Sequence, residues 1–452
     1  MADKLDLFGL SKDEQDALFS RIRRPQSTAT ASRSLVSEEI PRVQERYTSF
    51  KEFPELKKLK IEKEIATRAG IMNPFFKCHD GIAHGTTQIE GVEFLNFSTY
   101  DYLGFNGDPI LSEVAFEAAQ KWGTSASASR LVSGERPPHR ELEKALADIY
   151  CAEDCIAYVS GHATNVSTIS KLFGPNDIIF HDALAHNSIV FGAVTSGARR
   201  ISYPHNDCEA LEKLLKEHRF KAQRALIVTE GLFSMDGNIV DLPKLISLKK
   251  KYGAFLMVDE AHALGVLGAG RGTAEHFGID PREVDLWMGT LSKTCCGCGG
   301  YIAGSKEVVE LLKFTSPGFV YSVGMSPVLA AVSKKILDLM IAQPQRVNKL
   351  QEISHFFLES VKAKGFDTGR AQGYAIVPVM LGSSLLAGTL AARLFERRVN
   401  VMPIIHPVVE EGSARLRFFL SEAHTKEHIE QTVRILCEEF PKAKAIVQEK
   451  LR

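Results

Sequence analysis

The stretch Phe255-Leu-Met-Val-Asp259-Glu-Ala-His262 places four apolar residues directly before a polar run. A short apolar run of this kind predicts a buried strand, with Asp259 at its carboxyl end. The next apolar run, Leu286–Gly289, is followed by Thr290-Leu-Ser-Lys293 and then by small residues. Ligands of open α/β sheets bind at the carboxyl ends of the strands. The two runs therefore predict a ligand site with an aspartate and a lysine at successive strand ends.

This ordered pair suits the chemistry of pyridoxal 5'-phosphate (PLP). A carboxylate at Asp259 can pair with the pyridine nitrogen and keep it protonated, so that the ring withdraws electrons. An amine at Lys293 can hold the aldehyde as a Schiff base, and neighbours that desolvate the amine favour that chemistry. Asp259 taken alone could equally be a helix N-cap. The pair together predicts a PLP site.

A phosphate-binding turn is predicted upstream of these strands. Residues 156–165 have the pattern of a strand, a tight turn at Ser160, Gly161 and His162, and the start of a helix. Free N–H groups at a helix N-terminus bind phosphate, although an ordinary strand-to-helix turn would have the same pattern. His186 follows another predicted strand and could lie on an aromatic ring, but a lone histidine is more often structural.

Strand and helix patterns alternate from residue 94 onward, which predicts an α/β domain with a mostly parallel sheet. Beyond about residue 342 short strands mix with helices, which predicts a smaller α+β domain. Before residue 90 the pattern is a capped helix after Ser11, a polar linker and a charged helix from Pro54. We therefore expect an N-terminal helical arm and linker (1–90), a large PLP-binding domain (91–342) and a C-terminal domain (343–452). The predicted strands of the large domain are Cys155–Val159, Ile178–His181, Ala225–Thr229, Phe255–Val258 and Leu286–Gly289.

Composition indicates a soluble, globular, cytoplasmic protein. The chain has 452 residues, 44% hydrophobic and 24% charged, with a formal net charge of zero, so no electrostatic attraction to nucleic acid is implied. No signal peptide and no apolar run of transmembrane length is visible. The eight cysteines are irregularly spaced, which indicates reduced thiols.

Two other motifs resemble ligand-binding motifs but do not predict the corresponding sites. The glycines of 268–272 have the wrong spacing for a dinucleotide loop and do not follow a strand. The cysteines of 295–298 have no second pair of ligands at metal-binding spacing, so no metal site is expected.

The ordered series of motifs resembles the α-oxoamine synthases, a family of fold-type I PLP-dependent transferases, over residues 53–439. The series consists of Asp101–Gly104, Ser133-Gly134, His181–His186, Thr229–Gly237, Val258–His262, Thr290–Lys293 and Ala414–Arg417.

The resemblance implies a role for each matching residue. Lys293 would carry the cofactor and act as acid and base at the substrate α-carbon, and Asp259 would pair with the ring nitrogen. His186 would stack on the ring, and His262 would bond the ring oxygen, helped by Ser234. The remaining roles are phosphate binding by Ser160 and the Gly161 and His162 amides with Thr290, and binding of the substrate carboxylate by Arg417.

The resemblance also implies the reaction. A small L-amino acid or glycine would condense with an acyl thioester and lose carbon dioxide, giving an α-amino ketone and a free thiol. The segments 94–104 and 123–139 are similar to synthases of polyketide and fatty-acyl assembly systems, so the donor would be acyl carrier protein or acyl-CoA. Family members are homodimers with active sites at the subunit interface. Val323 and Gly324 replace hydroxyl residues of some relatives in a segment that reaches the partner's phosphate, and Tyr100 replaces an asparagine.

Two alternatives remain from the sequence. An aminotransferase of the same fold would share the lysine and the aspartate but would release no thiol. A non-catalytic scaffold subunit of a synthase complex should lack the lysine, and Lys293 is present.

Overall fold

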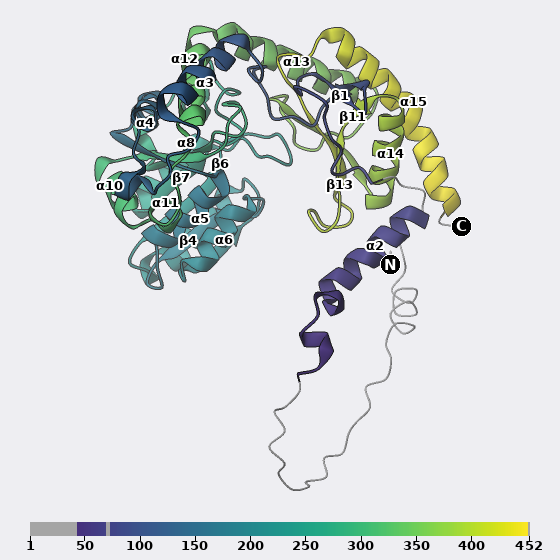
Figure 1. Cartoon of the computed structure of the whole chain (residues 1–452). Helices are drawn as coiled ribbons and strands as arrows, with labels where there is room; N and C mark the ends of the chain where they lie inside the picture. The colour runs from purple at the N-terminus through teal and green to yellow at the C-terminus, as the bar shows by residue number, and fades with distance from the viewer. Residues whose placement is uncertain (1–42, 69–72, 451–452) are drawn as a thin grey trace, which may run out of the picture.

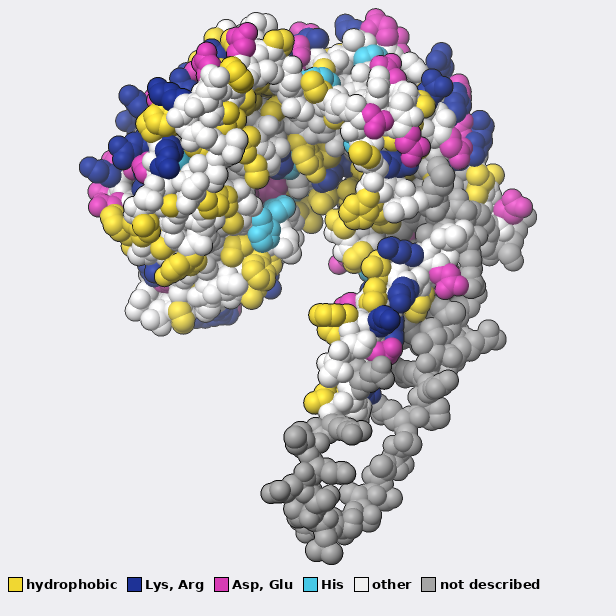
Figure 2. Space-filling view, in the orientation of Figure 1, with side chains coloured by type: hydrophobic (Ala, Val, Ile, Leu, Met, Phe, Trp, Pro, Cys, Tyr) yellow, Lys and Arg dark blue, Asp and Glu magenta, His cyan; other side chains and the backbone are white. Residues whose placement is uncertain are grey.

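The computed structural model describes residues 43–68 and 73–450, which form two lobes and an extended arm (Figure 1). The predicted helix after Ser11 and the linker lie outside these residues. The charged helix predicted from Pro54 is confirmed as α2 (Pro54–Arg68), which projects away from both lobes. Figure 2 shows that the surface is hollowed between the lobes, with histidine and apolar side chains on the wall of the large lobe.

The large domain is built on a seven-stranded sheet of order β3-β9-β8-β7-β6-β4-β5. All pairings are parallel except those of β9, which is antiparallel to β3 and β8, so the mostly parallel sheet is confirmed. Each predicted strand is present with its ends shifted by at most one residue. Strands β5 and β9 were not predicted. The strands are β3 (Asp154–Tyr158), β4 (Ile178–Asp182), β5 (Arg199–Tyr203), β6 (Ala225–Glu230), β7 (Phe255–Asp259), β8 (Leu286–Thr290) and β9 (Gly300–Gly304).

Helices cover both faces of this sheet, which is why its central strands are apolar throughout. In β6, Leu226 and Val228 belong to one core cluster and Ile227 to the other. One face packs against α5 (Gly161–Leu172), α6 (Asn187–Thr195) and α10 (Lys306–Thr315) through Ile169, Ile189 and Val309. The other cluster includes residues of α4 (Pro137–Ile149), α7 (Cys208–His218), α8 (Leu242–Tyr252) and α12 (Pro327–Ala342).

The smaller lobe combines residues from both ends of the described chain. Its first sheet has the order β1-β2-β11, so the hairpin on either side of residue 90 pairs with the C-terminal segment. Its second sheet has the order β10-β13-β12. The domain limits at 90 and 342 therefore stay predictions. The elements are β1 (Thr86–Ile89), β2 (Val92–Asn96), α13 (Pro344–Ala363), β10 (Ile376–Gly382), α14 (Ser384–Glu396), β11 (Val399–Asn400), β12 (Met402–Ile404), β13 (Ala414–Phe419) and α15 (Lys426–Lys450).

Within the described ranges, no helix has both the length and the apolar character that crossing a bilayer requires.

Candidate active site

Neighbouring strands bring the predicted aspartate and lysine to one edge of the sheet. Asp259 is the last residue of β7, and Lys293 follows the end of β8, which pairs with β7. Glu230 ends β6 and lies opposite Asp259 in the β6–β7 register. The carboxyl ends of three adjacent strands therefore meet at one place, as the sequence predicted for two of them.

Lys293 has the character of a reactive amine. Loss of hydration lowers the pKa of Lys293 to about 8, although the charges of Asp259 and Glu230 act in the opposite direction. Its Nζ lies 5.9 Å from the centre of the Tyr100 ring. A lysine with this pKa is partly neutral near physiological pH, and the neutral amine is the nucleophile.

Asp259 is buried, with 4% of its surface exposed, and both of its oxygens accept hydrogen bonds. The Asn165 amide donates to Oδ2 over 2.9 Å, and the Ala261 backbone N–H donates to Oδ1 over 2.9 Å. The second bond caps the turn that follows β7. Asp259 therefore also acts as a cap, which is the alternative role that its position in the sequence allowed. Each oxygen keeps a lone pair for a further donor.

The two predicted histidines are both held by hydroxyl groups. Nδ1 of His186, the N-cap of α6, lies 2.7 Å from Ser188 Oγ. Nδ1 of the buried His262 lies 2.7 Å from the Tyr102 hydroxyl. Desolvation and, to a smaller extent, the charge of Lys293 lower the pKa of His262 well below its usual range. Desolvation also lowers the pKa of His186, against the charge of Asp259. Burial therefore favours the neutral form of both rings, and each ring has a hydroxyl partner.

The predicted phosphate turn is the first turn of α5. Ser160 is its N-cap, and the amides of the first turn have no acceptor within the helix. A Cβ on Gly161 would lie 2.8 Å from Oγ1 of Thr290, so only glycine lets the helix start this close to the end of β8. The Thr290 hydroxyl donates to the Gly299 carbonyl over 2.9 Å. His162, the second residue of α5, is in this turn, and its side chain is exposed.

Arg417, on β13 of the smaller lobe, faces the same edge. Its Nη1 donates to the Ser234 carbonyl over 3.0 Å, and its guanidinium lies 4.6 Å from the centre of the Phe419 ring. Its Nε is buried and has no hydrogen-bond partner in the described part of the chain. Desolvation lowers the pKa of Arg417. A carboxylate ligand would supply the missing acceptor.

Three residues at this edge were not singled out from the sequence: Glu230, Asn165 and Tyr102. Glu230 is 3% exposed, and desolvation and the Asp259 charge raise its pKa to about 8. Its Oε2 accepts from the Ser234 backbone N–H over 3.2 Å, while Oε1 is buried without a partner among the described residues. All three lie in or beside quoted motifs, but only the folded chain shows which neighbours they contact.

The residues present fit PLP. Arg417 Nε, Glu230 Oε1 and Asn165 Oδ1 are buried polar atoms that lack partners within residues 43–68 and 73–450, which indicates room for polar ligand atoms. The close approach of Gly161 to Thr290 leaves helix amides open to a phosphate. A cavity of about 280 Å³ adjoins Lys293; its lining includes Tyr100 and Cys296 but not Asp259 or Gly161.

Three larger cavities in the described residues are lined by neither Lys293 nor Asp259. A cavity of about 400 Å³ lies at the opposite edge of the sheet, where Phe173, Phe255 and Trp287 line it. The described residues contain no cluster of three metal-binding side chains. The eight cysteines, all within the described ranges, form no disulfide.

The fold and the site define a fold-type I PLP-dependent transferase. The chain belongs to the aminotransferase class I and II family, whose family model matches residues 92–436.

Similarity to named proteins places the chain in a narrower group within this class of transferases. The chain is 42% identical over 347 residues to 8-amino-7-oxononanoate synthase of Geobacter sulfurreducens, covering 76% of this chain and 88% of that protein. The synthase of Treponema denticola is 34% identical over 398 residues, covering 88% and 97%. A serine palmitoyltransferase structure from S. paucimobilis with bound PLP and myriocin has a TM-score of 0.83 at 26% identity, covering 86% of this chain and 98% of that chain.

These relatives confirm the predicted family, fold class and cofactor: the protein is a PLP-dependent α-oxoamine synthase. They also confirm the reaction class, a decarboxylative condensation of an amino acid with an acyl thioester.

Proposed function

We propose that Lys293 holds PLP covalently and that the surrounding residues have the roles implied by their motifs. The observation that carries this proposal is the desolvated Lys293 amine beside two buried carboxyl groups, Asp259 and Glu230, at the ligand-binding edge of the sheet. When bound, PLP supplies an aldehyde that condenses with amines and a ring that withdraws electrons from the substrate α-carbon.

Lys293 also handles the proton of the substrate α-carbon. Because its pKa of about 8 is close to physiological pH, its amine can accept that proton and return it. Asp259, held by the Asn165 and Ala261 donors, would accept the N–H of the ring nitrogen when PLP is bound. This carboxylate keeps the ring nitrogen protonated through the reaction.

The histidines and the phosphate turn orient the ring. His186 would cover one face of the ring when PLP is bound. In the tautomer with the proton on Nε2, His262 would accept from the Tyr102 hydroxyl at Nδ1 and donate to the ring oxygen, and Ser234 would assist at the same oxygen. Ser160, the amides of Gly161 and His162, and the Thr290 hydroxyl, after it turns from Gly299, would hold the phosphate.

Arg417 binds the carboxylate of the amino acid through its guanidinium, using the Nε that is otherwise buried without a partner among the described residues. The amino acid is glycine, alanine or serine. The names of the relatives point to different substrates, since one set is named for an amino-oxo acid and the other for serine and a palmitoyl group. The acyl donor is a thioester of an acyl carrier protein or of CoA.

The protein acts as a cytoplasmic homodimer whose active sites lie at the subunit interface. The resemblance to the family supports this assembly, and the exposed Tyr321 and Val323 lie in the segment expected to approach the partner's phosphate.

The test begins with the visible spectrum of the PLP-loaded protein during separate titrations with glycine, L-alanine and L-serine. A saturable change in the visible band with one of them identifies the amino acid. Thiol release from acyl-CoA and from acyl carrier protein then identifies the donor.

Two results would contradict the proposal. Absence of a visible band with excess PLP would show that Lys293 does not hold the cofactor, and it would favour the scaffold alternative. Turnover of a keto acid without thiol release from either donor would favour an aminotransferase.

A further inference from the structure

One buried amide connects two of the side chains proposed to face the cofactor. Asn165 lies on α5 and is 1% exposed. Its Nδ2 lies 2.9 Å from Oδ2 of Asp259 and 2.9 Å from Oγ of Ser188. Ser188 Oγ in turn lies 2.7 Å from Nδ1 of His186. The amide therefore links the end of β7 to the start of α6.

The direction of each bond in this chain is fixed. A backbone N–H can only donate, and the N–H of Ser188 donates to Nδ1 of His186 over 3.3 Å. Nδ1 is therefore an acceptor, and the proton of the neutral ring is on Nε2. The Ser188 hydroxyl accepts from Asn165, so its own proton is available for His186. The chain thus runs from Asn165 through Ser188 to His186.

The orientation of the amide is also fixed, by the carboxylate. Rotation of the Asn165 amide by 180° would bring its Oδ1 against the Asp259 oxygen, where two acceptors repel. In the observed orientation Oδ1 is buried and has no partner within the described residues. An unpaired buried carbonyl is unfavourable. The two donations, to Asp259 and to Ser188, therefore determine the orientation of the amide.

The same helix carries the proposed phosphate turn. Gly161 and Asn165 are four residues apart, so they lie one helical turn apart on one face of α5. We propose that Asn165 is a positioning residue that holds Asp259 and, through Ser188, His186 in register with the phosphate turn of α5. This inference rests on the proposed function, because it assumes that Asp259 and His186 contact PLP.

The test uses Asn165→Leu, which keeps the side-chain size and removes both donors, and Ser188→Ala, which removes only the branch to His186. PLP-free protein is titrated with PLP to give the dissociation constant, and the visible band of the bound form is followed against pH. We expect Asn165→Leu to weaken PLP binding about tenfold or more and to shift the pH midpoint of the band. Ser188→Ala should shift the midpoint with a smaller loss of affinity, about threefold.

Thr168→Val provides the matched control, because Thr168 is buried on the same helix and lies outside the proposed chain. It should leave both the dissociation constant and the pH midpoint unchanged. If Asn165→Leu only lowers the thermal stability and keeps the wild-type dissociation constant and midpoint, the positioning role is wrong.

If Asn165→Leu does not fold, Ser188→Ala decides: wild-type values for both quantities overturn the inference. If wild-type protein itself gives no visible band, the proposed function fails, and the inference with it.

Discussion

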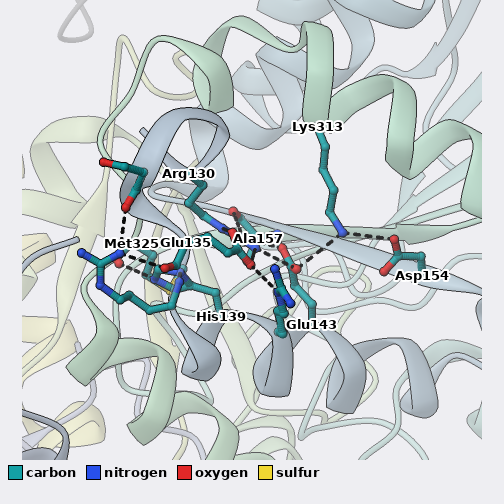
Figure 3. Close-up of polar contacts among 11 residues, drawn as sticks. Arg130, Glu135, His139, Glu143, Asp154, Ala157, Lys313 and Met325 are labelled. Atoms are coloured by element: carbon teal, nitrogen blue, oxygen red, sulfur yellow. Dashed lines mark hydrogen bonds and ion pairs between the residues drawn. The ribbon is translucent and has the colours of Figure 1, made fainter. Parts of the chain in front are cut away.

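Two buried polar clusters in the large domain differ in how completely their groups are paired. In the first, here called the charge cluster, Arg130 lies between Glu135 and Glu143, and Lys313 links Glu143 to Asp154 (Figure 3). Arg130 Nε is 2.7 Å from Glu135, and its Nη1 and Nη2 are 2.5 and 2.9 Å from the two oxygens of Glu143. Although desolvation alone would lower it, the hydrogen bonds and charges of both glutamates raise the pKa of Arg130.

The second, here called the site cluster, consists of Lys293, Asp259, Glu230, Arg417 and Asn165. Its charges influence one another, but three of its buried atoms lack hydrogen-bond partners in the described part of the chain. Burial weakens the charged form of its lysine, its arginine and Glu230. Saturated pairing fits a structural role, whereas incomplete pairing at a strand edge fits a site that a ligand completes.

The largest expected effect is the loss of activity in Lys293→Ala. We expect turnover to fall by more than about 10³-fold, because the amine that holds the cofactor and moves the α-proton is removed. The unfolding midpoint of the PLP-free variant should not fall, since a desolvated amine is lost. Lys313→Ala, in the charge cluster, is the control and should keep its activity per folded molecule. If the Lys293 variant still turned over at the wild-type rate, the conclusion that the site cluster is functional and the charge cluster structural would be wrong.

The charge cluster should show the opposite response. Arg130→Met leaves the buried Glu143 with Lys313, 3.6 Å away, as its remaining cation, so we expect a loss of about 3 kcal/mol in the free energy of unfolding, measured with urea. Arg140→Met is the matched control, because Arg140 also bonds Glu135 over 3.1 Å but has a side chain that is 77% exposed. That change should cost less than about 1 kcal/mol. Equal losses for the two variants would show that burial does not set the strength of this cluster.

The sequence predicted what depends on local pattern and missed what depends on contacts between distant segments. The apolar runs gave five strands, and their polar ends gave Asp259 and Lys293, because position along a strand determines which edge a residue reaches. Strand β9 escaped prediction, since Gly300–Gly304 has few large apolar side chains and its place between β3 and β8 depends on pairing. Asn165 was missed for a similar reason. Glu230, in contrast, directly follows the predicted strand Ala225–Thr229, so the pattern that identified Asp259 could have identified it.

Gly324 illustrates the same limit. Compared with relatives, the sequence placed the cross-subunit contact of this segment in doubt. In the structure, a Cβ at Gly324 would lie 2.8 Å from Cγ of Arg130, and its backbone N–H donates to the Ala128 carbonyl over 2.9 Å. His139 Nε2 also bonds the Met325 carbonyl over 2.7 Å. The glycine therefore accommodates the charge cluster, while the contact with a partner stays a prediction.

A smaller effect should distinguish the two kinds of buried glutamate by pH. The pKa of Glu230 is raised from 4.5 to about 8, so its contribution to stability is present below pH 4.5 and is lost as pH rises toward 8. Glu230→Gln should therefore gain stability relative to wild type across this window, by on the order of 2–4 kcal/mol in urea unfolding of the PLP-free protein.

Glu439 serves as the control with the opposite sign. Burial raises its pKa, but the bonds and charges of Lys442, Arg393 and Arg397 lower it overall. Its contribution is therefore present at neutral pH and is lost as pH falls below the usual glutamate range. Glu439→Gln should lose stability at pH 7 and little at low pH. Parallel pH dependence in the two variants would mean that Glu230 is paired like Glu439.

The smallest effect is expected at Arg417, the arginine of the site cluster that corresponds to Arg130 of the charge cluster. Arg417→Lys keeps the positive charge but loses the planar pair of donors that includes Nε, so a carboxylate is bound by one point charge. We expect KM for the amino acid to rise about 10–100-fold with little change in kcat, because this contact is made equally before and during the reaction. Unfolding stability should fall by only about 1 kcal/mol, because the bonds at risk are those of Nη1 to Ser234 and Met235, while Nε has no partner within the described residues. A large loss of stability with an unchanged KM would place Arg417 with Arg130, as an arginine whose partners are inside the protein and not on the substrate.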